Sequence, residues 1–193
     1  MPHGGDAQAL TRWWSRFNDP LLVDLIAAAQ KSSGTLAQAA AAIERFKLTP
    51  GQLAPTGAAE VVVGGFPRQG AHSDKDIAFD DKGNVYVNIG LPSNACGNPD
   101  RQPGAKGIDP CTQLETGGGV WKFSADTPGQ TFSPGNRYAT GMRQGLALAW
   151  QYGHLYMAMN SRDSIDTMYP DLFKPEDNQN RPLEPLLQVN EGS

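Results

Sequence analysis

Two residues of this sequence, His72 and Arg143, are of types that could act together in catalysis. A neutral imidazole accepts a proton near pH 7, and a guanidinium stabilises negative charge that develops on a nearby oxygen. Each residue opens a stretch that predicts two short strands around a turn. Taken singly, each would more often be a surface or capping residue, so their placement relative to each other decides whether they form a site.

The stretches that these residues open, 72–90 and 143–161, match each other in spacing. Both contain a strand pattern that ends in an aromatic residue, a turn with Gly, and a second strand pattern with Tyr. The match predicts a repeated β-hairpin, and chance pairing of two unrelated hairpins is the alternative. Equivalent positions are 70 or 71 residues apart, and they are the pairs His72 and Arg143, Phe79 and Trp150, Gly83 and Gly153, and Tyr86 and Tyr156.

A recurring hairpin with turn signals at short intervals is typical of the blades of a β-propeller. A blade takes roughly 40–50 residues, and an irregular loop between the two cysteines would fill the longer spacing here. The innermost strands of a propeller line a central axis, so equivalent strand entrances converge at one end of it. His72 and Arg143 are therefore expected to face a common pocket from neighbouring blades.

The composition changes near residue 45, where alanine and leucine give way to Gly, Pro, Asn, Asp and aromatic residues. The change predicts a helical segment over residues 1–45 and a β segment over residues 46–193. In the helical segment, Asp19 is a suitable N-cap and Pro20 suits the first helical position. An apolar stripe follows, residues 32–34 interrupt it, and a second short helix is expected from there to about residue 46.

From residue 46 onward the apolar residues recur with a period of two, which is typical of strands. No space remains between the strand candidates for crossover helices, so the sheets are expected to be antiparallel. The fold class is therefore mainly β, preceded by a short helical hairpin. After two strands around a Pro/Gly loop in residues 46–66, the strand candidates are KDIAF, NVYVNIG, GVWKFS, LALAW and HLYMAMN.

The two cysteines, Cys96 and Cys111, lie 15 residues apart in a loop-like stretch. A zinc site would require four ligands at tighter spacing, and no histidine lies near them. The pattern favours a disulfide that closes an irregular loop, and hence an oxidising compartment. Two free or buried thiols in a cytosolic protein are the alternative.

The charge and hydropathy of the chain exclude some classes of partner. A net charge of −4 gives no reason to expect nucleic acid as a partner. No apolar run approaches the roughly 20 residues that span a bilayer. The start, MPHGGDAQAL, is polar and has no apolar signal core. If the protein is exported, either its signal has been removed or this start is not the native one.

Residues 13–45, WWSRFNDPLLVDLIAAAQKSSGTLAQAAAAIER, resemble the opening of the periplasmic helical region of outer-membrane efflux factors. The tryptophan pair, the Phe-Asn-Asp-Pro-Leu turn and the alanine-rich helix ending in Ile-Glu occur in the family's order. The stretch covers a small part of that fold, and any amphipathic helical hairpin is the alternative. The resemblance would imply a fusion with an efflux-channel fragment.

Residues from about 45 to 193 resemble the soluble pyrroloquinoline quinone (PQQ)-dependent glucose/sorbosone dehydrogenases, most of all the sorbosone branch. The resemblance implies a six-bladed β-propeller with PQQ at the top of its central channel. It also implies a periplasmic enzyme that passes electrons from a sugar or aldehyde to an acceptor such as a quinone or a cytochrome. The matching stretches are HSDKDIAFDDKGNVYVNIGLPSNAC, GIDPC, GGGVWKFSAD, RYATGMRQGLALAW and LYMAMNSRDSID.

The same resemblance implies roles for five residues. His72 matches the family's catalytic base, and Arg143 matches the arginine beside the quinone. Gln144 falls where the family usually has Asn at the cofactor. Ser161 and Arg162 match positions whose backbone carbonyls hold the Ca²⁺ that binds PQQ. These types suit the oxidation of an aldose, because an imidazole can take the hydroxyl proton as hydride leaves and Ca²⁺ acts as a Lewis acid.

Three departures from the family pattern bear on this prediction. Gln144 replaces Asn, and Asn160 and Ser161 replace His-Gly in the calcium turn, where Ser tolerates positive φ poorly. The β segment of about 148 residues suffices for two to three blades, so we expect a partial propeller, either a fragment or a fusion. A non-catalytic propeller segment used for binding or assembly is the alternative function.

Other polar residues are expected to have no catalytic role. His154 follows Gly153 in a hairpin turn and is expected to be exposed. Asp163 and Asp166 are expected to be solvated or to form turns. The DDKG sequence at residues 80–83 is typical of a hairpin turn and lacks the further ligands of a calcium loop.

Overall fold

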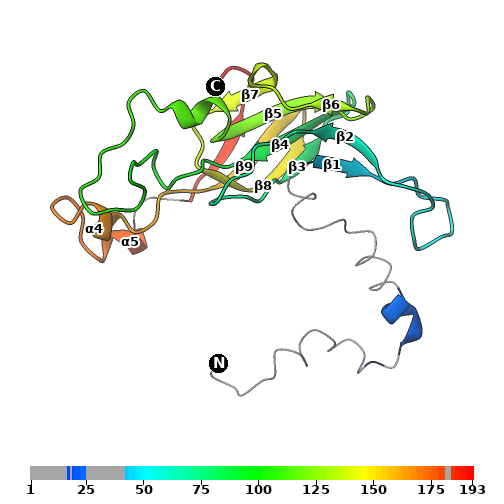
Figure 1. The fold of residues 1–193 in the computed structure, drawn as a ribbon, viewed down its shortest axis with the longest axis horizontal. Coiled ribbons are helices and arrows are strands. Elements are labelled where there is room, and N and C mark those ends of the chain that lie inside the picture. The colour runs from blue at the N-terminus through cyan, green and yellow to red at the C-terminus, as the bar shows by residue number, and fades with distance from the viewer. Residues whose placement is uncertain (1–16, 18, 25–41, 181–183) are drawn as a thin grey trace. The chain divides into compact units, whose positions relative to one another are not determined.

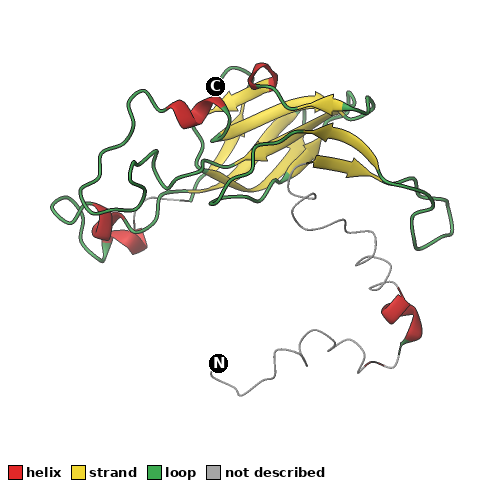
Figure 2. Ribbon diagram, viewed as in Figure 1, coloured by secondary structure: helices red, strands yellow, loops and turns green. Residues whose placement is uncertain are grey.

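The computed structural model describes residues 17, 19–24, 42–180 and 184–193. These residues fall into two compact units, one with residues 17, 19–24 and 46–58 and the other with residues 42–45, 59–180 and 184–193. All named strands belong to the second unit (Figures 1 and 2). Within the described ranges, no helix has the length and apolarity needed to cross a membrane.

The described part of the first unit contains the start of the predicted first helix. Residues 20–24 are helical, and Pro20 takes the first helical position. The carboxylate of Asp19 accepts a hydrogen bond from the backbone N–H of Leu22 at 3.2 Å, which confirms the predicted N-cap. Residues 25–41, over which the rest of this helix and most of the second were predicted, lie outside the described residues.

The end of the predicted second helix is wrong, because Ala42–Arg45 form a strand, β1. β1 pairs antiparallel with β2, Glu60–Gly64, and Ile43 packs against the core under β2. Helix propensity is a weak preference that such pairing and burial override. Residues 46–58 between the two strands form a loop. The first of the two strands that were predicted within residues 46–66 therefore lies earlier in the chain, as β1.

The strands form three sheets, ordered β1-β2-β6, β3-β4-β5-β7 and β10-β9-β8. Every pair is antiparallel as predicted, except that β6 runs parallel to β2. Between the strands lie the short helices η2 Thr112–Glu115, η3 Pro134–Asn136, α4 Ile165–Met168 and α5 Asp177–Asn180. The remaining strands are β3 Ile77–Phe79, β4 Asn84–Ile89, β5 Gly119–Ser124, β6 Gln130–Thr131, β7 Arg137–Thr140, β8 Gln144–Gln151, β9 His154–Asn160 and β10 Leu186–Val189.

The two hairpins predicted by the sequence repeat are β3–β4 and β8–β9, and they share a register. Tyr86 and Tyr156 each lie opposite an alanine of the preceding strand. The hairpins differ at their entrances, because β3 is much shorter than β8. His72 therefore lies in a loop before β3, whereas Arg143 immediately precedes β8.

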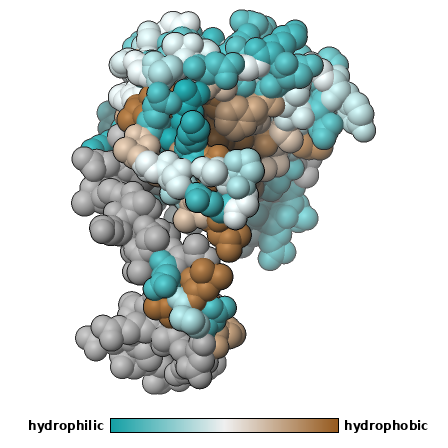
Figure 3. All heavy atoms as spheres, turned by 90° about the vertical axis from the view of Figure 1, so that its right-hand side faces the viewer, coloured by the Kyte–Doolittle hydropathy of each residue, from teal (hydrophilic) through white to brown (hydrophobic). Residues whose placement is uncertain are grey.

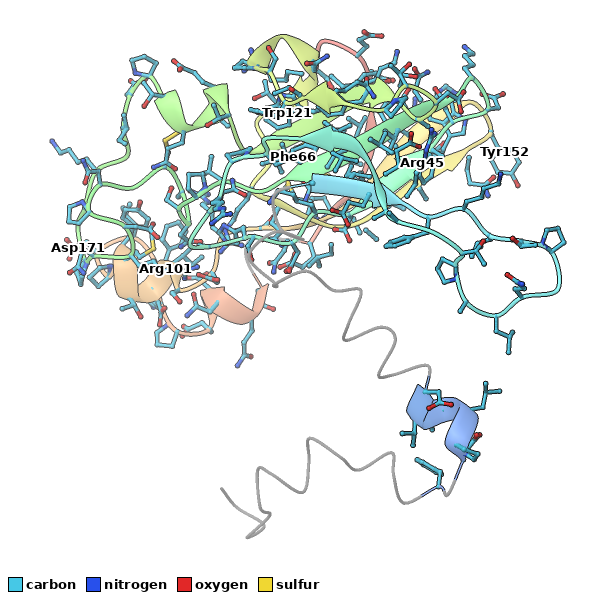
Figure 4. All side chains as sticks on the ribbon, turned by 45° about the vertical axis from the view of Figure 1, so that its right-hand side comes forward. Arg45, Phe66, Arg101, Trp121, Tyr152 and Asp171 are labelled. Atoms are coloured by element: carbon cyan, nitrogen blue, oxygen red, sulfur yellow. A yellow bond between two sulfur atoms is a disulfide. The ribbon has the colours of Figure 1, made fainter. Side chains whose placement is uncertain are left out.

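Two clusters of buried apolar side chains hold the sheets together. The first lies around Trp121, which is fully buried, and Phe66, both labelled in Figure 4. The second joins the four-stranded sheet to the third sheet, where Tyr86 stacks on Trp150 with ring centroids 5.5 Å apart. The first cluster consists of Val62, Val63, Phe66, Val85, Val87, Ile89, Trp121 and Phe123, and the second of Ala78, Tyr86, Val120, Ala139, Met142, Leu155, Met157 and Val189.

Asn88 links β4 to β8 across the two sheets. Its buried amide accepts a hydrogen bond from the Gly145 N–H at 3.2 Å and donates one to the Gly145 carbonyl at 3.3 Å. A Cβ at position 145 would lie 2.9 Å from Asn88 Cγ and 2.8 Å from the Met157 sulfur, so the position requires glycine. This link brings the segment after β4 close to the segment before β8.

Apolar side chains remain exposed on some strands. In the view of Figure 3, apolar patches lie between hydrophilic side chains. β3 and β8, each at the edge of its sheet, expose Ile77, Phe79 and Leu146. In the described part of the chain these side chains are not covered by other elements.

Candidate functional site

The backbone of Leu91, just after β4, connects the two residues that the sequence singled out. Its carbonyl lies 2.5 Å from Nδ1 of His72, and its N–H donates to the carbonyl of Arg143 at 2.7 Å. His72 and Arg143 thus belong to one site, although they are 71 residues apart in the chain. Leu91 thus joins the His72 ring to the Arg143 backbone, and a pocket that both side chains face stays a prediction.

The hydrogen bond to Leu91 decides which nitrogen of His72 could accept a proton. A carbonyl oxygen only accepts, so Nδ1 carries the hydrogen and, in the neutral ring, Nε2 holds the lone pair. His72 has φ of 51°, a conformation that is uncommon for residues other than glycine and is found more often at functional sites. Gly90 allows this arrangement, because a Cβ there would lie 2.5 Å from that of His72.

The surroundings of His72 favour its neutral form. Burial lowers the pKa of His72 below its ordinary value of 6.5, and the positive charges of Arg143 and Arg101 lower it further. The hydrogen bond to Leu91 and the negative charge of Asp163 only partly oppose this. His72 is therefore in the form that a general base requires at neutral pH.

A pH titration of the His72 ring by NMR is expected to give a pKa below 6.5 in the folded chain. Because the unfolded chain then binds more protons, His72 should make the free energy of unfolding fall as the pH drops below about 6.5. This part of the pH dependence should vanish in His72→Gln and persist in His154→Gln. An equal pH dependence of stability in His72→Gln and in the wild type would contradict it.

Arg143 is held by hydrogen bonds in the interior, with 6% of its side chain exposed. Its Nε donates to the side-chain and backbone oxygens of Asn94 at 2.9 and 3.1 Å. Its Nη2 donates to the carboxylate of Asp163 at 3.0 Å. Burial lowers the pKa of Arg143 and Asp163 opposes this, and a guanidinium keeps its charge in proteins.

Three residues that the sequence analysis did not assign complete this network, and they are Asn94, Arg101 and Asp163. Arg101, beside α4 in Figure 4, forms an ion pair with Asp163. Partial burial would raise the pKa of Asp163, but the hydrogen bond from Arg101 and the charge of Arg143 outweigh it and lower that pKa. Asp163 is half exposed, as expected of a solvated residue, and it also pairs with both arginines.

Gln144 lies at the start of β8 and is buried, with 6% exposure. Its Oε1 is 3.4 Å from where a Cβ of Gly90 would stand, which places the amide near the backbone that packs against His72. Among the described residues the Gln144 amide has no hydrogen-bond partner. It is thus a buried polar group that could bind a ligand beside His72.

A cleft of about 410 Å³ opens next to Arg143. Ser161 and Arg162, predicted from the family pattern, line it, whereas His72 and Gln144 do not. The cleft lies between the disulfide loop, the segment before β8 and the segment after β9. Its lining residues are Leu91, Asn94, Ala95, Cys96, Cys111, Leu114, Gly141, Met142, Arg143, Met159, Ser161 and Arg162.

The predicted calcium turn has a backbone that serine tolerates. Ser161 is not among the residues with positive φ, and its N–H donates to the carboxylate of Glu184 at 3.0 Å. Across the ranges that the structure describes, no group of three or more His, Cys, Asp or Glu side chains could hold a metal. Calcium binding here would depend on backbone carbonyls, and it stays a prediction.

The sulfurs of Cys96 and Cys111 form a disulfide in the wall of the cleft. The loop that it closes is further held by the N–H of Ile108, which donates to the Cys96 carbonyl at 2.8 Å. Arg101 lies inside this loop and Asn94 directly before it. The disulfide therefore supports the segment that carries two members of the Arg143 network.

Replacing both cysteines with serine is expected to lower the free energy of unfolding by about 3 kcal/mol, since the loop of 15 residues loses its cross-link. Urea unfolding of the variant and of the oxidised wild type would measure the difference. Adding a reductant should reproduce the loss in the wild type and change nothing in the variant. Equal stabilities of the variant and the oxidised wild type would refute this.

Comparison with known proteins gives one structural match. No model of a protein family and no curated protein matches the chain. The fold is similar to the holo form of the PQQ domain of pyranose dehydrogenase from Coprinopsis cinerea, with 15% identity and a TM-score of 0.50. The match covers 64% of this chain and 29% of that one. At this identity the likeness shows the fold alone: a mainly β chain of several antiparallel sheets, similar to part of a PQQ domain.

Proposed function

We propose that the chain acts within a PQQ- and Ca²⁺-dependent dehydrogenase that oxidises an aldose or a sorbosone-like sugar. The arrangement at Leu91 carries the proposal, because it places a neutral histidine and a buried arginine on one backbone segment. The likeness of the fold to a PQQ domain supports the choice of cofactor. A six-bladed propeller, of which this chain would supply two to three blades, is part of the proposal.

The residues present fit such a cofactor. Nη1 of Arg143 and the amide of Gln144 make no hydrogen bond within the described part of the chain, so both could bind oxygens of a quinone or carboxylate. Nε2 of His72 would take the proton of the substrate hydroxyl. When bound, PQQ would supply the hydride acceptor, and Ca²⁺ held by the carbonyls of Ser161 and Arg162 would supply a Lewis acid.

The location and the electron acceptor are also part of the proposal. A disulfide persists in an oxidising compartment such as the periplasm, which supports that location. Electrons from the sugar or aldehyde would pass to a quinone or a cytochrome. Nothing in the charge of the chain favours nucleic acid as a partner.

A dye-linked assay on the longest open reading frame that contains this chain tests the proposal. The protein is loaded with PQQ and Ca²⁺ and given a panel of aldoses and sorbosone. Dye reduction that requires both PQQ and Ca²⁺, and that a chelator abolishes, is the expected result. A folded protein that reduces no dye with any of these substrates would refute the proposal.

A non-catalytic propeller segment for binding or assembly is a second candidate. The hydrogen bonds of Arg143 favour this candidate, because its Nε and Nη2 already donate to Asn94 and Asp163 within the fold. This candidate predicts that calorimetry detects no affinity for PQQ or Ca²⁺, whereas the proposed enzyme binds both. The efflux-fragment prediction concerns residues 13–45, most of which lie outside the described residues.

A further inference from the structure

Three charged residues form a cluster at the edge of the cleft. The carboxylate of Asp163 bonds to Nη2 of Arg143 at 3.0 Å and pairs with both terminal nitrogens of Arg101. The side chain of Arg143 is buried, whereas that of Arg101 is 40% exposed and that of Asp163 is 50% exposed. One carboxylate thus lies between a buried and a partly exposed guanidinium.

Asn94 fixes the geometry of this cluster. It is 1% exposed, and its Oδ1 accepts from Nε of Arg143 at 2.9 Å and from the Asp163 N–H at 3.3 Å. Its Nδ2 donates to the Asp163 carbonyl at 2.9 Å. Because Asn94 holds Nε and Asp163 holds Nη2, the plane of the Arg143 guanidinium is set by two partners.

The cluster has a defined charge. Two guanidiniums share the Asp163 carboxylate, and the Asp100 carboxylate lies 3.8 Å from Nε of Arg101, so the four charges balance. Arg143, Arg101 and Asp163 are the charged groups that act on His72, while Asp74, Lys75 and Asp76 follow it in its own loop. Removing the Asp163 carboxylate would leave a net positive charge on the cluster and free Nη2 of Arg143 to turn.

We propose that Asp163 is a positioning residue of this site, which orients the Arg143 guanidinium and balances one of the two positive charges that it contacts. Its effect on turnover rests on the proposed function. Its effect on His72 does not, because that effect needs only the folded chain. The two effects can therefore be measured separately.

The test on the folded chain is the NMR titration of His72 in four variants. Asp163→Asn should lower the pKa of His72, because a negative charge near the ring is lost. Arg101→Gln and Arg143→Gln should raise it, because each removes a positive charge. Asp163→Glu, which restores the carboxylate, should return it toward the wild-type value. Shifts of one sign in all variants, or none in Asp163→Asn, would overturn the proposal.

The test on turnover uses the dye-linked assay. Asp163→Asn is expected to lower kcat/KM at least tenfold, with partial recovery in Asp163→Glu, while circular dichroism and unfolding confirm that both variants fold. Wild-type kinetics in a folded Asp163→Asn would overturn the positioning role. An inactive wild type would instead refute the proposed function, and the His72 titration would still decide whether the cluster acts on that residue.

Discussion

Replacing His72 with glutamine is expected to lower kcat of the PQQ-loaded protein by a factor of about 10² or more. Glutamine has a similar reach but cannot accept a proton at neutral pH, so the loss reports proton transfer. The structure supplies the reason to expect a large effect: the bond from Nδ1 to Leu91 leaves only Nε2 as the acceptor. Steady-state kinetics with the dye assay would measure it.

The matched control for this variant is His154→Gln. His154 begins β9 at the surface, and its Nδ1 lies 3.2 Å from the Gln188 amide, far in sequence from the Leu91 segment. Its replacement should leave kcat unchanged. In the wild type, kcat/KM should fall at pH values below the lowered pKa of His72, as the ring becomes protonated. Activity of His72→Gln within threefold of the wild type would rule out the general-base role.

Replacing Trp121 with alanine is expected to lower the free energy of unfolding by about 3–5 kcal/mol. Trp121 is fully buried in the first core cluster, and its ring centroid lies 5.5 Å from that of Phe132. The loss combines the transfer of the side chain with the cavity that remains. Urea unfolding at constant m-value would measure it.

Trp121→Phe separates packing from hydrogen bonding at this position. Nε1 of Trp121 is buried and has no hydrogen-bond partner in the described residues, so phenylalanine removes an unpaired donor along with some volume. Its cost should therefore be much smaller than that of Trp121→Ala. Tyr152→Ala, at a side chain with 92% exposure, is the surface control and should change little. An equal cost for both Trp121 variants would contradict this account.

Much of the strand order follows from local patterns. The runs GVWKFS and HLYMAMN have the bounds of β5 and β9, because apolar alternation and flanking turns define a strand without knowledge of its partner. β6, β7 and β10 were not predicted, since these short segments carry no alternation of their own and pair through the backbone. The residues of β1 were predicted to be helical because the segment before them is rich in alanine. They form a strand because they pair with β2, which the local sequence does not reveal.

For the candidate site, the sequence alone identified the residue types and the hairpin repeat that pairs His72 with Arg143, although the two lie at different distances from their strands. It also identified the cysteine pair, since loop composition and spacing are local properties. The tertiary structure decided the rest. It showed that the Leu91 backbone joins His72 to Arg143, and that Asn94 and Asp163, 69 residues apart, hold the guanidinium. The Leu91 contacts use backbone groups, which are the same in every residue and leave no pattern in the sequence. The contacts of Asn94 and Asp163 with Arg143 join side chains that come together only when distant segments pack.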